Sequence, residues 1–237
     1  MKLRSGIIGL GLLLGGTWGC GGSSAGTQPD PNFRFVNLCS DTNLDMLIDD
    51  TTQYTNIAFL DPTTVFKTTE SKLEDFSIQE TGTTDILDSQ TQAMSLNTDH
   101  LIISIGLKNF GAETEKRVRF VFQPINRALP NGSKARVYAM NTFVRSLGNQ
   151  DFAVIFKNPG TVSTINFSPV AFGEIAVQEI DAGSTTLVAQ RQSTETEVAT
   201  VTKNFEAGKV YFMALTGKES GTGTAAPTIN FFEIPTR

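Results

Sequence analysis

The feature that most constrains the fold of this chain is an alternation of apolar and polar residues along short segments. Residues 101–107, 117–122 and 210–215 place apolar side chains, most of them β-branched, leucine or aromatic, at every second position. A period of two predicts a β-strand with one buried face. Turn sequences such as Asp61-Pro62 and Asn158-Pro159-Gly160 separate many of these segments. Further strands are predicted at 44–49, 76–80, 135–140, 152–156, 174–180, 185–190, 197–202 and 228–234.

No segment of the mature chain has an apolar stripe with the 3.6-residue period of a helix, so an all-β fold is expected. Four short sequence matches recur in the same order and indicate an internal duplication. They pair 33–36 with 118–121, 56–59 with 164–167, 76–80 with 175–179, and 100–103 with 209–212. We therefore predict two tandem antiparallel β-sandwich domains, 33–112 and 113–237, joined near Lys108 to Glu115. The residues expected in their cores are Phe35, Ile78, Ile103, Phe120, Val177 and Phe212.

The N-terminus has the pattern of an export signal. Lys2 and Arg4 form a cationic head, and residues 7–14 form an apolar run of eight. Such a run matches the apolar region of a signal peptide and is shorter than the roughly 20 residues that span a bilayer. The run is followed by glycines and then by Cys20, directly after the small Gly19.

The segment Thr17-Trp18-Gly19-Cys20 resembles the lipobox of bacterial lipoproteins, in which the cysteine is acylated and the chain is cut on its N-terminal side. The family prefers leucine and a small residue where this chain has Thr17 and Trp18. The resemblance implies a signal peptide at 1–19, and a lipidated cysteine with a flexible Gly/Ser-rich tether at 20–32. An ordinary secretory signal with a chance cysteine is the alternative.

Lipidation at Cys20 implies a cell-envelope location with the membrane as a partner. Gly21 follows the cysteine where an aspartate would favour the inner membrane, so in a host with two membranes we expect the outer membrane, facing the periplasm or the surface. Cys39 is then the only other cysteine, and an internal disulfide is excluded. The formal charge is −5 and no basic stretch has interleaved aromatic residues, which argues against nucleic acid as a partner.

A second resemblance comes from residues 33–41 (FRFVNLCSD) and 44–49 (LDMLID). They are similar to the opening of a widespread bacterial envelope domain of unknown function, and 207–211 (AGKVY) and 135–139 (ARVYA) fit its later strands. The family has a proline where this chain continues past Ser40. The resemblance implies immunoglobulin-like or transthyretin-like sandwiches, often in tandem on secreted or lipid-anchored proteins. It defines no catalytic, cofactor or metal-binding residues.

Three groups of residues are candidates for chemistry. His100 is the only histidine, so a catalytic triad or a histidine metal site would have to use it, but a turn or strand-edge position is the simpler interpretation. Asp41, Asp45, Asp49 and Asp50 form the densest acidic cluster, yet they lack the spacing of a calcium loop. Cys39 ends an expected strand and is interpreted as a small buried side chain rather than a reactive thiol.

These observations predict a non-enzymatic, lipid-anchored envelope module with a structural or binding role, and no cofactor or metal. An envelope protein or a polysaccharide remains open as its partner. The first alternative is a subunit of a larger surface assembly that pairs through an edge strand. The second is a hydrolase, for which the sequence offers no visible pairing of a nucleophile with a base.

Overall fold

The computed structural model describes residues 28–61, 65–145, 152–160 and 164–237. These residues form sixteen strands and two short 3-10 helices. The first eight strands are β1 (Asn32–Asn37), β2 (Leu44–Ile48), β3 (Thr51–Ile57), β4 (Lys67–Thr68), β5 (Leu73–Glu80), β6 (Ile86–Ala93), β7 (Asp99–Ile105) and β8 (Arg119–Ile125), with η1 (Thr114–Lys116) before β8. The remaining elements are β9 (Lys134–Asn141), β10 (Val154–Lys157), β11 (Asn166–Val170), β12 (Ile175–Asp181), β13 (Gly183–Arg191), β14 (Glu197–Phe205), β15 (Val210–Thr216), η2 (Gly223–Ala225) and β16 (Thr228–Ile234).

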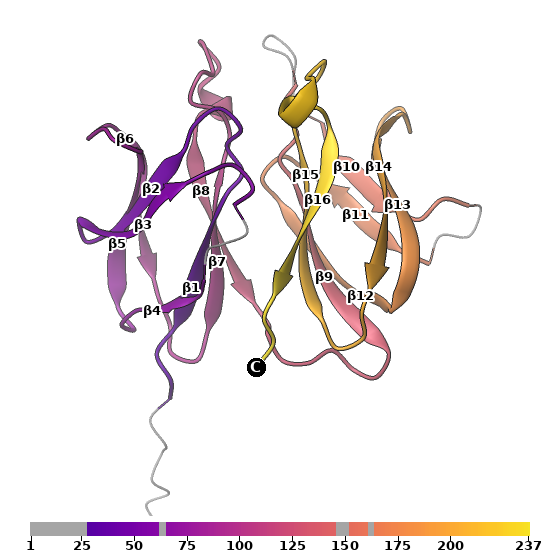
Figure 1. Ribbon diagram of the computed structural model, residues 1–237, viewed down its shortest axis with the longest axis horizontal. Coiled ribbons are helices and arrows are strands. Elements are labelled where there is room, and N and C mark those ends of the chain that lie inside the picture. The colour runs from indigo at the N-terminus through magenta and orange to yellow at the C-terminus, as the bar shows by residue number, and fades with distance from the viewer. Residues whose placement is uncertain (1–27, 62–64, 146–151, 161–163) are drawn as a thin grey trace, which may run out of the picture.

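The strands form four sheets that make two β-sandwiches, which confirms the predicted fold class. Unit 1 packs the sheet β3-β2-β5-β6 against β4-β1-β7-β8, and unit 2 packs β11-β10-β13-β14 against β12-β9-β15-β16. Adding eight to every strand number of unit 1 reproduces the sheet orders of unit 2, and η1 and η2 precede equivalent strands. Figure 1 shows the two units side by side with their strands in similar directions. The shared topology supports the predicted duplication.

The sheets β4-β1-β7-β8 and β12-β9-β15-β16 face each other and are called the inner sheets, and the other two are the outer sheets. The inner sheets are not purely antiparallel, whereas the sequence predicted antiparallel sandwiches. β1 lies parallel to β7, and β9 lies parallel to β15, while all other neighbouring strands in the four sheets are antiparallel. Each unit therefore closes its inner sheet by setting its first strand beside its seventh. The inner sheets are mixed.

The point at which the chain leaves unit 1 differs from the predicted boundary of 112 and 113. β8 pairs with β7 along its whole length, so it belongs to unit 1, and the sheets divide the chain at 126–133. Two of the four sequence matches also join strands that are not equivalent, because the counterpart of β1 is β9 rather than β8, and that of β5 is β13 rather than β12. Apolar alternation is common to all buried strands, so short matches select the wrong partner easily.

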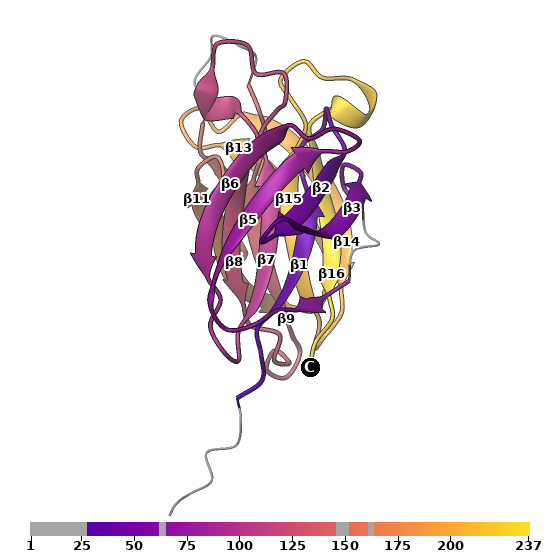
Figure 2. The same ribbon diagram turned by 90° about the vertical axis from the view of Figure 1, so that its left-hand side faces the viewer.

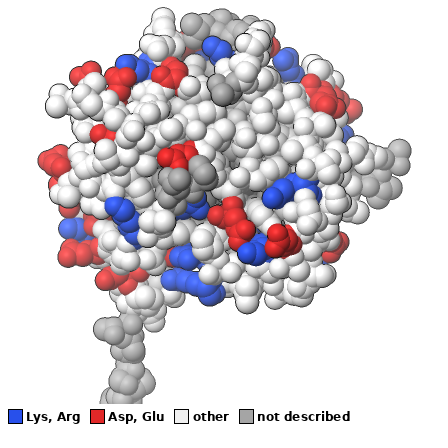
Figure 3. Space-filling model, viewed as in Figure 1, with Lys and Arg blue, Asp and Glu red and all other residues white. Residues whose placement is uncertain are grey.

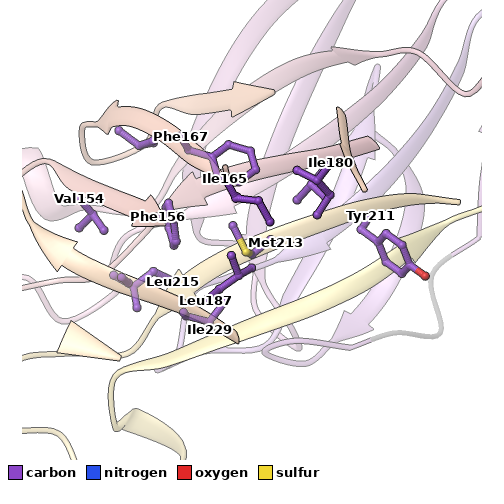
Figure 4. Close-up of a cluster of buried hydrophobic side chains, with 14 of the residues drawn as sticks. Val154, Phe156, Ile165, Phe167, Ile180, Leu187, Tyr211, Met213, Leu215 and Ile229 are labelled. Atoms are coloured by element: carbon purple, nitrogen blue, oxygen red, sulfur yellow. The ribbon is translucent and has the colours of Figure 1, made fainter. Parts of the chain in front are cut away.

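Three apolar clusters hold the four sheets together. One fills unit 1, a second fills unit 2 and includes Phe156, Leu187 and Met213 (Figure 4), and a third lies between the two inner sheets. The third cluster includes Ile103 of β7 and Phe212 of β15. The two sandwiches are thus packed face to face through an apolar interface rather than joined only by a linker.

Five of the six residues expected in the core are buried: Phe35, Ile78, Ile103, Phe120 and Phe212. The prediction was wrong for Val177, which is 50% exposed. Val177 lies on β12, an edge strand of the inner sheet of unit 2, and it lines a groove beside Pro124 of unit 1. Alternation identifies the face of a strand but not whether the opposing sheet extends far enough to cover it.

The strand directions give the molecule two distinct ends. The loop end carries residues 38–43, 106–118, 142–145 and 217–227, which follow β1, β7, β9 and β15 (Figure 1). The terminal end carries the start of β1, the loops 94–98 and 126–133, and the C-terminus (Figure 2). The chain therefore enters and leaves the described structure at one end, while turns from both units meet at the other.

Candidate functional site

The loop end is built from a glycine in each unit. Gly106 and Gly217 follow β7 and β15 with φ angles of +100° and +95°. A Cβ atom at these positions would lie 2.2 Å from the carbonyl oxygen of Arg117 and 2.3 Å from that of Ala226. Only glycine accommodates both the left-handed backbone and this close approach. The two glycines fix where the loops 107–118 and 218–227 leave the sheets.

A buried asparagine in each unit ties the inner sheet to the outer one. The Asn37 side-chain amide donates to the carbonyl of Ile57 at 2.9 Å, and the Asn141 amide donates to that of Val170 at 3.2 Å. In both units the side-chain oxygen accepts the N–H of the second residue further along the chain. These bonds hold the loops after β1 and β9 against the ends of β3 and β11. We call this junction of the inner and outer sheets at the loop end the corner of each unit. The corner has the same construction in both units.

In unit 1 this corner carries three charged residues. The Lys108 ammonium lies 2.6 Å from the Glu80 carboxylate. The two oxygens of Asp41 accept the N–H groups of Lys108 and Asn109 at 3.0 and 2.9 Å. With two carboxylates and one ammonium, the corner has a net negative charge. A polar hollow of about 470 Å³ beside it is lined by Ser40, Asp41, Thr42, Asn43, Asn56, Glu80 and Thr81.

In unit 2 the equivalent residues carry the opposite charges. Glu80 and Arg191 are equivalent, because they pair with Leu44 and Val154, the first residues of β2 and β10. Lys108 and Glu219 are equivalent, because each stands two residues after the turn glycine. The Arg191 guanidinium lies 3.0 Å from Glu219, so the ion pair is retained with its direction reversed. The third charged residue of each corner stands four residues after the buried asparagine. It is Asp41 in unit 1 and an arginine in unit 2.

That arginine, Arg145, gives the corner of unit 2 a net positive charge. Its Nε lies 3.4 Å from Glu219. The guanidinium carbons of Arg145 and Arg191 also lie 5.7 and 4.5 Å from the centre of the Phe152 ring, within the range of cation–π contacts. The loop end therefore presents an acidic corner and a basic corner of the same construction.

A groove of about 460 Å³ separates the two corners. It is lined by Leu107, Asn109, Val144, Arg145, Lys218, Glu219 and Ser220, so both units contribute. Lys116, which is almost fully buried, pairs with Glu113 at 2.7 Å and donates to the Arg145 carbonyl at 3.3 Å. This contact from η1 to unit 2 fixes the distance between the corners. The arrangement suits recognition of a partner with two oppositely charged groups.

The predicted acidic cluster is not a single site. Asp41 holds the loop at Lys108, Asp45 accepts the N–H of Asn56 at 2.7 Å, and Asp49 accepts the N–H of Asp75 and pairs with Lys72. Asp50 is an exposed turn residue. Within the described ranges, no group of three or more His, Cys, Asp or Glu side chains is placed to hold a metal ion. The aspartates act as caps and loop anchors.

His100 is buried, which corrects the interpretation of a turn or strand-edge residue. It stands on β7, between β1 and β8 in the inner sheet, and is 5% exposed. Burial lowers the pKa of His100, and the neighbouring Asp99 carboxylate partly offsets this, so the ring is held neutral. Its Nδ1 has no hydrogen-bond partner among the described residues. The sequence did not indicate this burial, because His100 and Asp99 interrupt the apolar pattern at the start of the strand.

Glu74 is a buried acid that the sequence did not indicate. It is 3% exposed on β5, and its Oε2 has no hydrogen-bond partner in the described part of the chain. Burial raises its pKa, and a hydrogen bond from Thr69 partly offsets the shift. Cys39 is fully buried in the core of unit 1, which confirms its interpretation as a small core residue. Burial raises the pKa of the Cys39 thiol, so a reactive thiolate is disfavoured.

A second buried acid, Asp99, fastens the terminal end. Its carboxylate lies 3.5 Å from Arg127 in the linker and 3.2 Å from Arg237 at the C-terminus, and it accepts a hydrogen bond from Asn32. It adjoins a groove of about 620 Å³ between the units, which is also lined by Gln123 and other polar residues. Because Asp99 is paired with cations from both ends of unit 2, its role is to lock the units together.

Cys20 lies outside the described residues, so its predicted lipidation stays a prediction. Among the helices that the structure describes, none is long and apolar enough to cross a membrane. The sequence also missed the charged corners, because their members are separated by long stretches of chain.

No family model matches the chain, and no curated protein matches its sequence. Solved structures of similar shape include the family 26 carbohydrate-binding module of Eubacterium rectale Amy13K in complex with maltoheptaose, with 10% identity, 86% of this chain and 97% of that chain covered, and a TM-score of 0.26. Candidate cell adhesion proteins from Bacteroides ovatus and Bacteroides eggerthii have 10% identity. They cover 88% and 89% of this chain and 96% and 98% of their own, with TM-scores of 0.22 and 0.23. Likenesses at this level carry no argument about a ligand.

Proposed function

We propose that the protein is a lipid-anchored envelope module that displays the loop end for binding a protein partner. The observation that carries this proposal is the separation of the two ends. The lipobox-like cysteine precedes β1 in the sequence, and β1 starts at the terminal end, so an anchor on Cys20 would leave the loop end facing away from the membrane. Loops that a rigid sandwich positions at one end are the usual place for recognition.

The charges at the loop end favour a protein over a neutral polysaccharide. The acidic corner at Asp41 and the basic corner at Arg145 lie on either side of one groove. Complementary charges on a partner would orient it across both units and would accelerate its association. Figure 3 shows the wider surface, where acidic side chains are prominent on the side of unit 1.

Site-specific photocrosslinking in intact cells tests the binding surface. A photoreactive residue at Asn109, beside the groove, is expected to capture an envelope protein, whereas one at Thr202, which is exposed on β14, is the matched control. Capture at Thr202 but not at Asn109 would contradict the proposal. Equal capture at both positions would show non-specific contact and would also count against it.

The anchor is tested separately by the variant Cys20→Ser. The acyl chains of a lipoprotein contribute roughly 0.8 kcal/mol per buried methylene, so the lipidated protein should stay with membranes through washing. The variant should be released into the soluble fraction, with the signal uncut or cut elsewhere. Recovery of the unmodified protein mainly in the soluble fraction would contradict the anchor.

Assembly through an edge strand is less well supported. β6 is the long free edge of the outer sheet of unit 1, but Asp88 near its start accepts the N–H of Phe120 on β8 at 2.8 Å. This bond fastens the edge to the inner sheet of the same unit. A charge that points inward on an edge strand also discourages pairing with another strand.

A further inference from the structure

The exposed apolar side chains of the molecule are unevenly distributed. Six large hydrophobic residues among those described are exposed, and three are leucines of the terminal end: Leu73, Leu96 and Leu129. They are 68%, 45% and 65% exposed. Single exposed leucines are ordinary on protein surfaces, but three at the end where the chain enters are a feature of that end.

Each leucine is placed there by backbone contacts. Leu73 opens β5 at the end opposite to Glu80 and pairs with Ala93. Leu96 stands in the loop between β6 and β7, beside Asn97, whose N–H donates to the Pro29 carbonyl at 2.7 Å. The loop that holds Leu96 thus contacts the segment that leads back toward Cys20.

Leu129 extends the apolar tips to the other unit. It lies in the linker 126–133, and its Cδ2 is 3.8 Å from the position of a Cβ on Gly208, in the turn before β15. The three leucines of the terminal end therefore come from unit 1 and from the linker that leads into unit 2.

Several cations of the terminal end are paired with carboxylates. They include Lys72 with Asp49, Lys134 with Asp181, Lys209 with Glu233, and Arg237 with Asp99. Cations that are already paired attract an anionic membrane only weakly. Contact of this end with a bilayer would therefore depend on its apolar tips.

We propose that the terminal end rests on the bilayer that carries the anchor, with Leu73, Leu96 and Leu129 inserted at the headgroup level. The inference rests on the proposed lipid anchor at Cys20. Only seven residues lie between Cys20 and Gln28, the first described residue, and even a fully extended chain across these eight steps spans only about 30 Å. The anchor thus confines this end near the membrane surface, where weak apolar contacts are sufficient for docking.

Tryptophan fluorescence in vesicles tests the docking. Trp18 is the only tryptophan of the sequence and lies in the predicted signal peptide, so Leu96→Trp provides the sole reporter in the processed full-length lipoprotein. In vesicles of phosphatidylcholine with brominated acyl chains, we expect quenching of its emission by about half or more, with a blue shift. The matched control Asn109→Trp, at the loop end, should be quenched by less than about a tenth.

The possible outcomes separate the docking from the anchor. If Leu96→Trp floats with the vesicles but is not quenched, the anchor stands and the docking is wrong. If the protein does not float with the vesicles, the anchor is wrong and the docking falls with it. Quenching of Asn109→Trp to the same extent would mean that the molecule lies flat, and would also overturn the proposal.

A second variant tests whether the leucines are responsible. In the unlipidated Cys20→Ser protein, the triple change Leu73→Ser, Leu96→Ser and Leu129→Ser should weaken partition into vesicles about tenfold, because it removes exposed apolar area without disturbing the core. The triple change Thr52→Ser, Thr55→Ser and Thr91→Ser on exposed strand positions is the control and should have no effect. Partition that depends strongly on anionic lipid or on salt would contradict the apolar basis of the contact.

Discussion

The loop-end corner of unit 1 holds Lys108 against Glu80 with Asp41 beside them, whereas the same corner of unit 2 holds Glu219 against Arg191 with Arg145 beside them. The backbone construction is the same in both, but every charge is reversed. Partly exposed ion pairs contribute only about 0–1 kcal/mol each to stability, so their sign has little influence on the fold. The difference indicates that glycine and asparagine fix the corner, while its charges remain available for recognition.

Among the residues of the two corners, the turn glycines should have the largest effect on stability. Gly106→Ala and Gly217→Ala would each add a strained left-handed residue and a Cβ within 2.3 Å of a carbonyl oxygen. We expect each change to reduce the free energy of unfolding by about 3 kcal/mol or more, as measured by urea denaturation. Gly82→Ala, with a similar φ but nothing within 4 Å of the Cβ, is the control and should lose only about 1 kcal/mol. A glycine variant as stable as the control would break the equivalence of the two corners.

The buried asparagines should have the next largest effect. Asn37→Ala and Asn141→Ala would leave carbonyls of the corner, including those of Ile57 and Val170, without their donor. Leaving buried groups unpaired costs about 2–4 kcal/mol in total. Denaturation monitored by hydrogen exchange in each unit would show whether each loss is confined to its own sandwich. Asn43→Ala, which removes only an exposed contact with Asn56, should change the stability by less than about 0.5 kcal/mol.

Acidification should distinguish the two units, because only unit 1 contains a histidine. The pKa of His100 is lowered in the folded state, so the unfolded chain binds more protons below about pH 6.5 and unit 1 loses stability as the pH falls. Glu74 opposes this, because its raised pKa makes the folded state take up a proton first, and that contribution declines as the pH rises above about 4.5. The two slopes therefore have opposite signs within one sandwich.

The variant His100→Gln should remove the first slope and leave the second. As the pH falls from 6.5 toward 4.5, unit 1 of this variant should become more stable relative to its own value at pH 6.5, as measured by hydrogen exchange. Glu74→Gln is the converse control, and in it the loss of stability on acidification should be steeper. Equal slopes in the two variants would mean that neither group controls the pH response of unit 1.

The smallest effect on stability is expected from the charges that distinguish the corners. Lys108→Glu would set a second carboxylate against Glu80 and should cost about 1 kcal/mol. Adding Glu80→Arg recreates the ion pair of unit 2 and should restore stability to within about 0.5 kcal/mol in a double-mutant cycle. The double variant keeps Asp41 and therefore the net negative charge of this corner. A further Asp41→Arg would make both corners basic, and this triple variant should fail to capture the partner at Asn109. Normal capture by the triple variant would separate the charges from recognition.

The sequence predicted the buried strands well, because alternation of apolar residues is a direct consequence of one covered face. It did not predict the edge strands β3, β6 and β11, whose polar sequences, such as ILDSQTQA in β6, carry no such pattern. The interpretation of Cys39 was confirmed and that of His100 was wrong, since a neutral ring can be buried at the start of a strand while the pattern gives no sign of it.

The boundary between the units was misplaced for a physical reason. The charged loop 106–118 interrupts the strands as a linker would, but it is an excursion at the loop end that returns to the same sheet as β8. One signal could have corrected the alignment: an apolar residue followed by asparagine ends β1 at Val36-Asn37 and β9 at Met140-Asn141. The charged corners had no such signal, because the pairing of Glu80 with Lys108 depends on the folded register of three strands.

The parallel pairing of β1 with β7 also bears on the order of folding. Asn32 and Asp99 are 67 positions apart, yet they lie side by side, so the first strand to be synthesised cannot find its place until the seventh exists. Folds dominated by such distant contacts have high contact order and form slowly, over milliseconds to seconds. In the export that we propose, the chain would pass through a translocon as an extended polypeptide, and this delay would keep each sandwich open during transit and restrict closure to the far side of the membrane.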